Sequence, residues 1–236
     1  MKFLRYVVLI FTLFLLVETT HADLIIPPEV NKIDQLASEA FSKLKFFKMS
    51  ETICGDGNCG TIYAEINQSE GKAHYKITQG NDTVEGYVIG GMTYEKGLGP
   101  SMHINTWRKT REVPLKISNM LNPKQQSLEN CLKMHPTNGP DKISLAEGLI
   151  DGKECYVVDI EYPEQDNGNF LITSNKLFYQ KNTHLFYGQH LTIESGQFKA
   201  SNEIKYYDYD VPLEIKLPPE AINAKEVSSE EMKSSH

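Results

Sequence analysis

The stretch that decides the fold class is Glu154-Cys155-Tyr156-Val157-Val158-Asp159-Ile160-Glu161-Tyr162. Every second residue from Tyr156 to Tyr162 is apolar, whereas Asp159 and Glu161 fall on the other face of an extended chain. This alternation predicts an antiparallel strand with one buried and one solvated face. Asp151-Gly152 precedes it and is typical of a hairpin turn. The pair of strands around this turn therefore predicts an antiparallel sheet.

Similar patterns recur along most of the chain. Gly80-Asn81-Asp82 is a second strong turn signal, and Gly90-Gly91 separates two further strand patterns. We predict strands over residues 61–67, 72–79, 83–89, 92–96, 104–109, 143–150, 154–162, 170–180, 184–193, 200–209 and 213–217. The succession indicates a meander of short antiparallel strands.

Helical spacing appears in two places. After Pro27-Pro28, apolar residues recur at intervals of three and four and predict an amphipathic helix over residues 30–47. Two short helical pieces are expected between residues 114 and 134, broken at Asn122-Pro123. We therefore expect a mainly β (α+β) protein, with a strongly curved antiparallel sheet and these helices on its concave side. Such thin cover leaves two alternatives open: an apolar hollow or partner-binding surface, or a sheet closed on its own side chains.

The N-terminus has the features of a secretory leader. Lys2 and Arg5 precede an apolar run over residues 6–17, and Thr20-His21-Ala22 supplies small residues at a cleavage site. The run is shorter than the roughly 20 residues of a spanning helix, although a retained anchor is the alternative. We predict a signal peptide over residues 1–22, a single domain over 23–219 and a disordered acidic tail over 220–236. The protein is then exported, periplasmic in a Gram-negative bacterium and otherwise secreted, without stable membrane insertion.

The formal net charge of −7 disfavours nucleic acid as a partner, because its binding is driven by cationic side chains. The four cysteines of an exported chain favour disulfides, for which three pairings exist. Cys54 and Cys59 flank a four-residue turn and are expected to bond locally, which leaves Cys131 with Cys155. A metal knuckle or a redox pair is the alternative use of these cysteines.

No grouping of residues indicates catalysis. The histidines are scattered without metal-ligand spacing, and no serine lies in a nucleophile elbow. Asp208 and Asp210 are two residues apart, which suits solubilising charge better than paired carboxylates. We predict no enzyme, no cofactor and no metal, and an enzyme of unrecognised chemistry is a rival hypothesis. Asn67 and Asn81 each begin a glycosylation sequon, which has meaning only in a eukaryote.

Two segments carry a resemblance to a known family. The run from Tyr87 to Lys96, followed by Trp107-Arg108-Lys109, resembles a segment of LppX/LprG-type lipoproteins. The stretch over residues 185–218 resembles the ending shared by the wider LolA/LolB-like superfamily, over a span of residues 30–219 in all. The resemblance implies a half-open antiparallel barrel with helices in its mouth, which carries acyl chains or lipoproteins. This chain departs from the lipoprotein members in lacking their lipid-attachment cysteine.

The resemblance and the thin helical cover together predict a soluble exported carrier of acyl chains or lipoprotein lipid. The expected partners are a lipid or an acylated lipoprotein, with a membrane protein as a further partner. The alternative is a periplasmic or extracellular module that docks protein or senses lipoproteins, without transport. The residues expected to line the hollow are Phe41, Leu44, Phe47, Tyr94 and Trp107, for which ordinary core packing is the competing interpretation.

Overall fold

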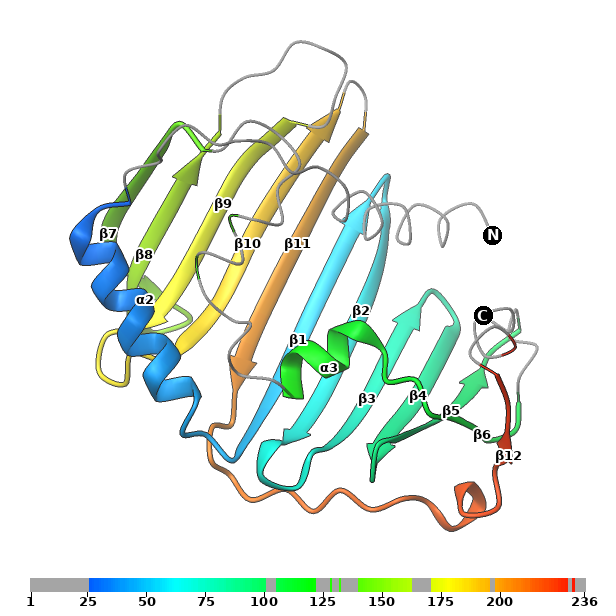
Figure 1. The fold of residues 1–236 in the computed structure, drawn as a ribbon. Coiled ribbons are helices and arrows are strands. Elements are labelled where there is room, and N and C mark those ends of the chain that lie inside the picture. Colours follow the sequence, from blue (N-terminus) through cyan, green and yellow to red (C-terminus); the bar gives the residue numbers. More distant parts are fainter. Residues whose placement is uncertain are drawn as a thin grey trace.

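The computed structural model describes residues 26–100, 105–121, 128, 132, 140–162, 171–195, 198–228 and 231. Its centre is one sheet of 12 strands in the order β12-β6-β5-β4-β3-β2-β1-β11-β10-β9-β8-β7 (Figure 1). The strands are β1 (Phe46–Gly55), β2 (Asn58–Asn67), β3 (Lys72–Gln79), β4 (Asp82–Ile89), β5 (Met92–Leu98), β6 (Arg108–Thr110), β7 (Lys142–Ile150), β8 (Lys153–Glu161), β9 (Leu171–Gln180), β10 (Phe186–Ser195), β11 (Phe198–Tyr207) and β12 (Lys225–Glu226). The helices are α2 (Pro28–Phe41) and α3 (Leu115–Leu121), with 3-10 turns η1 (Gln68–Glu70) and η3 (Pro219–Ala221).

β1 joins two meanders into one sheet. Strands β2 to β6 follow one another on one side of β1, and β11 back to β7 follow on the other. All neighbours are antiparallel except β12, which runs parallel to β6. The pairing of Lys48 with Tyr207 joins residues far apart in the sequence. Local sequence patterns do not reveal such a pairing.

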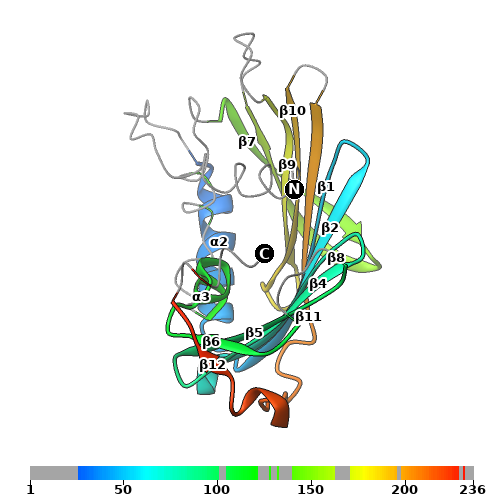
Figure 2. The same cartoon turned by 90° about the vertical axis from the view of Figure 1, so that its right-hand side faces the viewer.

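The sheet is strongly curved, and both described helices lie on its concave side (Figure 2). Beneath them the buried apolar side chains form two clusters. The first spans β1 to β4 with α3 and the end of α2, and includes Phe47, Met49, Ile66, Tyr75 and Met120. The second lies between α2 and β7 to β9, and includes Val30, Ile33, Val158, Leu177 and Tyr179. The expected fold class, a curved and unclosed antiparallel sheet with an N-terminal helix, is confirmed.

The predicted N-terminal helix was too long. α2 ends at Phe41 with Ser42 as its C-cap, and Phe47 belongs to β1 instead. Phe47 continues the helical spacing, but it also alternates with Met49 along an extended chain. Pairing with β2, which begins at Phe46, and with β11, which begins at Lys48, favours the strand.

The C-terminal segment was also mispredicted. No strand forms over residues 213–217, and the chain past Pro218 is ordered through η3 and β12. The backbone N–H of Val227 donates to the carbonyl of Lys109 at 2.9 Å. Ala221, Ala224 and Val227 are buried, so their spacing of three was the signal of a docked segment. A disordered tail was expected from residue 220, whereas residues 219–226 carry η3 and β12 in the structure.

The cysteine prediction is confirmed where the structure describes it. Cys54 and Cys59 face each other on β1 and β2 and form a disulfide. Asp56 and Gly57 make the turn between them, both with positive φ, which suits Gly and is tolerated by Asp. Cys155 is a free, buried thiol, and Cys131 lies outside the described residues. The Cys131–Cys155 bond therefore stays a prediction, as does the leader over residues 1–22, which is also outside them.

Candidate functional site

The candidate site is the concave face of the sheet beneath α2. α2 begins at Pro28, where the fixed φ of proline suits the first helical turn. Its apolar stripe of Val30, Ile33, Ala37 and Phe41 is buried against the sheet. Figures 1 and 2 show the helix crossing the sheet on this side, separate from α3. A single amphipathic helix thus covers the β7 to β9 part of the concave face.

Aromatic rings join the two apolar clusters near the C-terminal end of α2. Phe47 of β1 lies 5.8 Å from Tyr206 of β11, measured between ring centroids. Tyr206 continues to Phe186 of β10 at 5.5 Å, and Phe186 to Tyr179 of β9 at 5.3 Å. Phe41 covers Phe47 from the helix at 5.0 Å. These five rings are here called the aromatic row: the four on the strands form a continuous apolar floor, and Phe41 lies over it from α2.

A polar contact ties the middle of α2 to the sheet. The Tyr179 hydroxyl donates to Asp34 Oδ1 at 3.2 Å, and the Leu128 backbone N–H donates to the same oxygen at 2.8 Å. Asp34 sits one residue beyond Ile33 on the half-buried side of the helix. The helix is therefore held by apolar packing along its length and by the hydrogen bond between Tyr179 and Asp34. The net energy of such a hydrogen bond is modest.

Polar side chains occupy inward positions farther along the strands. They are Glu51 on β1, Asn202 on β11, Gln189 on β10, Asn175 on β9 and Tyr162 just after β8, together called the polar band. Asn202 Nδ2 donates to Glu51 Oε1 at 2.8 Å. Gln189 Nε2 donates to Asn175 Oδ1 at 2.8 Å, and Asn175 Nδ2 lies 3.4 Å from the Tyr162 hydroxyl. The sequence reasoning missed this band, whose signal is a polar residue at a position that alternation assigns to the apolar face.

A buried polar pair lies on the β3 to β5 part of the concave face. The hydroxyl of Tyr75 donates to the carboxyl group of Glu95, and both side chains are buried. Burial first, and then the charge of Glu95, raise the pKa of Tyr75 well above its ordinary value of 10.0. Tyr75 therefore stays a neutral donor at any physiological pH.

The structure places three of the five expected lining residues on the concave side and two elsewhere. Phe41, Leu44 and Phe47 are buried in the first apolar cluster. Tyr94 pairs with Tyr87 on the outer face of the sheet, and the Trp107 ring packs on Tyr87 at 5.7 Å. Strand alternation shows which residues share a face but not which face is concave. On β5 the inward positions belong to the buried Thr93 and Glu95, so the expectation for Tyr94 and Trp107 was wrong.

The outer face near Tyr87 carries a charged cluster. The His74 ring stacks on Tyr87 at 4.5 Å, and its two nitrogens lie 3.1 Å from Glu65 Oε2 and 3.0 Å from Glu85 Oε1. Burial alone would raise the pKa of both carboxyl groups, but the hydrogen bonds from His74 and the neighbouring positive charges outweigh it, and both pKa values are lowered. Burial, together with Glu85, raises the pKa of Tyr87 to about 12.

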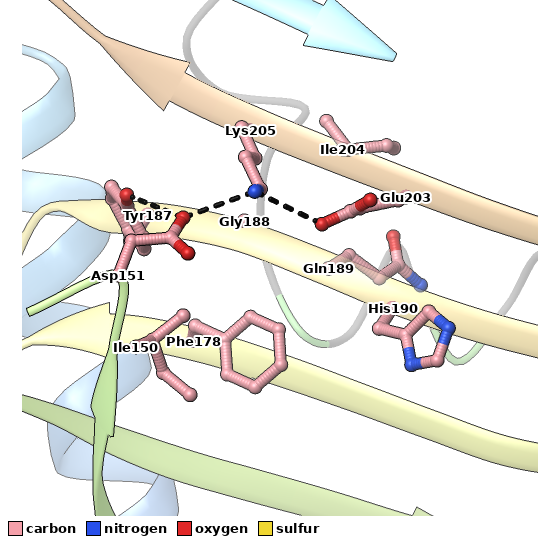
Figure 3. A pocket seen from close by; sticks show the side chains of 10 residues that line it. All are labelled: Ile150, Asp151, Phe178, Tyr187, Gly188, Gln189, His190, Glu203, Ile204 and Lys205. Carbon is pink, nitrogen blue, oxygen red and sulfur yellow. Dashed lines mark hydrogen bonds and ion pairs between the residues drawn. The ribbon is translucent and has the colours of Figure 1, made fainter. Parts of the chain in front are cut away.

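A second concavity, of about 230 Å³, lies on the outer face where β9, β10 and β11 meet the β7–β8 turn (Figure 3). It surrounds Gly188, beside an irregularity in the β9–β10 pairing. Lys205 Nζ lies 3.0 Å from Asp151 Oδ2 and 3.1 Å from Glu203 Oε1, and the Tyr187 hydroxyl donates to Asp151 Oδ2 at 3.1 Å. These groups point at one another in Figure 3, so the recess is lined by a mutually paired network.

The described residues offer neither a metal site nor a membrane-spanning helix. No group of three or more His, Cys, Asp or Glu side chains in that part of the chain is placed to hold a metal ion. None of the helices formed by the same residues is long and apolar enough to cross a membrane.

Comparison with solved structures identifies the fold. The lipoprotein LppX of Mycobacterium tuberculosis is similar with a TM-score of 0.52 and 12% identity, over 81% of this chain and 100% of that one. LprF from Mycobacterium bovis is similar with a TM-score of 0.51 and 13% identity, over 81% of this chain and 98% of that one. No protein-family model and no curated protein matches the sequence at a significant level. The chain has the LppX/LprF fold, as the sequence resemblance predicts.

Proposed function

We propose that this protein is an exported carrier that binds acyl chains, of a lipid or of an acylated lipoprotein, on the concave face beneath α2. The observation that carries the proposal is the cover of that face: one amphipathic helix lies over an apolar floor built by several strands. The LppX/LprF fold and the predicted leader agree with it. In this proposal α2 is a lid, which leaves the sheet when the acyl chain enters.

The energies of lid and ligand are comparable. Burying a side chain such as Val30, Ile33 or Phe41 stabilises the closed lid by about 1.5–3 kcal/mol each. A buried methylene contributes about 0.8 kcal/mol, so an acyl chain of about ten methylenes replaces the packing that α2 gives up. Shorter chains should therefore bind poorly, whereas longer ones should displace the helix. Release follows the same exchange in reverse, as transfer requires.

The direct test is lipid content and lipid binding of the mature protein. We expect native mass spectrometry to show co-purified lipid, and a fluorescent acyl probe to bind saturably, with affinity rising across chains of 8 to 16 carbons, a range that brackets about ten methylenes. Protein without lipid that also shows no saturable probe binding would remove the carrier function, and a protein-docking module would take its place.

Lid variants test the mechanism. Phe41→Asp places a charge in the aromatic row and should weaken probe binding strongly, whereas Leu149→Asp, at an exposed position on β7, should not change it. Because Phe41→Asp also endangers folding, Tyr179→Phe is the milder variant. It removes the hydroxyl that donates to Asp34, at a cost of about 1 kcal/mol for that hydrogen bond, and should accelerate probe exchange. Unchanged exchange in a folded Tyr179→Phe protein would contradict the lid.

A further inference from the structure

We propose that the polar band binds the head group of the cargo and selects hydroxyl- or ammonium-bearing amphiphiles over free fatty acids. This inference rests on the proposed carrier function and adds a ligand class to it. Among the described residues, the band is where polar side chains of adjacent strands gather on the concave face and hydrogen-bond to one another: Glu51, Tyr162, Asn175, Gln189 and Asn202.

Packing alone does not account for the band. Glu51 is 2% exposed and Asn175 is 0% exposed, and both occupy inward positions whose strand neighbours are Ile204 and Leu191. Burying a polar group costs free energy unless its hydrogen bonds are made, and apolar residues of similar volume would fill the same positions at lower cost. Polar residues retained at such positions are commonly functional.

An acceptor in the band points to a ligand with a hydrogen to donate. The Nδ2 amide of Asn202 donates to Glu51 Oε1, whereas its buried Oδ1 has no hydrogen-bond partner among the described residues. A buried acceptor without a partner is costly, and a hydroxyl or ammonium group of a ligand would satisfy it. The carboxyl group of Glu51 beside it accepts from the same kinds of donor.

The band is placed correctly for the head of a molecule whose tail lies under α2. On β1, Glu51 follows Phe47 by four residues on the same face, and on β11, Asn202 precedes Tyr206 by four. At about 3.3 Å per residue the band lies about 13 Å from the aromatic row. An acyl chain on the aromatic row can therefore keep its polar end at the band.

The acid group of the band sets the selectivity. A fatty-acid head would bring a second carboxyl group next to Glu51, and two carboxyl groups that share a site cannot both ionise without cost. A glycerol head offers hydroxyl donors to Glu51 and Asn202 instead. The same residues that accept hydrogen bonds from a hydroxyl head group thus disfavour a carboxylate head group.

The experiment compares two ligands with the same tail, 1-monopalmitoylglycerol and palmitate, as competitors of a fluorescent acyl probe at neutral pH. We expect the mature wild-type protein to bind the monoacylglycerol about tenfold more tightly, the effect of one satisfied buried acceptor. Glu51→Gln should bring the affinity ratio toward one by improving palmitate binding. Asn202→Leu should bring it toward one by weakening monoacylglycerol binding alone.

The matched control is Glu203→Gln, the same chemical change at an exposed outward position of β11, which should leave the ratio within twofold of wild type. If the wild-type protein binds palmitate at least as tightly as the monoacylglycerol, the head-group inference is overturned while the carrier function stands. An equal shift of the affinity ratio in Glu51→Gln and Glu203→Gln has the same consequence. If neither ligand displaces the probe, and the probe itself does not bind saturably, the carrier function fails and the inference with it. The wild-type ratio needs no variant, so a variant that does not fold leaves the inference testable.

Discussion

Gly86→Ala should destabilise the protein, because the added methyl group would overlap the ring of Tyr75. Gly86 on β4 faces Tyr75 on β3, and a Cβ built at Gly86 would lie 2.5 Å from Tyr75 Cε2 and closer still to Cζ and the hydroxyl. Carbon atoms in contact normally lie about 3.5–4.0 Å apart. The ring has no free space to enter, because Tyr75 is 0% exposed and its hydroxyl is bonded to Glu95.

The expected cost follows from those contacts. Overpacking of this kind costs about 1–3 kcal/mol, and a ring pushed aside also loses a hydrogen bond to an acid group worth about 1.5–3 kcal/mol. We expect a loss of about 3 kcal/mol in the free energy of unfolding and a fall in Tm of about 6–12 °C. Urea and thermal unfolding followed by circular dichroism measure both.

Two further variants make this prediction specific. Gly148→Ala on β7 is the matched control, since its added Cβ would lie 3.4 Å from Val157 Cγ2, where the neighbour needs to yield little. We expect it to cost less than about 1 kcal/mol. In the double variant Tyr75→Leu/Gly86→Ala the two effects should fall short of their sum by about 1 kcal/mol or more. A cost below about 0.5 kcal/mol for Gly86→Ala, or strict additivity, would refute the reasoning.

Three other predictions concern the outer face, the tail and the cysteines. The lowered pKa values of Glu65 and Glu85 contribute stability that is present above their ordinary value of 4.5 and is lost as the pH falls through the lower folded values. Urea unfolding between pH 7 and pH 3 should therefore show a fall that is shallower in Glu65→Gln, and an identical fall in both proteins would contradict this. Truncation after Pro218 removes β12 from the edge of β6 and should lower Tm and increase aggregation, unless the tail contributes nothing to the fold. Mass mapping of non-reduced peptides should recover a Cys131–Cys155 pair from exported protein, and a free thiol at both positions would exclude it.

The sequence determined the secondary structure and its class wherever the pattern is local. Alternation around Asp151-Gly152 gave the β7–β8 hairpin, and the short loop between Cys54 and Cys59 gave the disulfide. A hairpin needs only neighbouring residues and one turn, so these elements are specified by the chain next to them. The apolar stripe from Val30 to Phe41 likewise required a surface to lie on, and the concave sheet provides it.

Tertiary structure decided which face of each strand points inward and which distant strands meet. Phe47 satisfies both a helical and a strand pattern, and only its pairing with Ile66 of β2 makes it a strand residue. Tyr94 looks apolar enough for the interior, but the curvature of the sheet turns Thr93 and Glu95 inward instead. The polar band is assembled from residues as far apart as Glu51 and Asn202, which β1–β11 pairing brings together. A period of two fixes only that neighbours face opposite ways, whereas the sign of curvature and the pairing of remote strands depend on the whole chain.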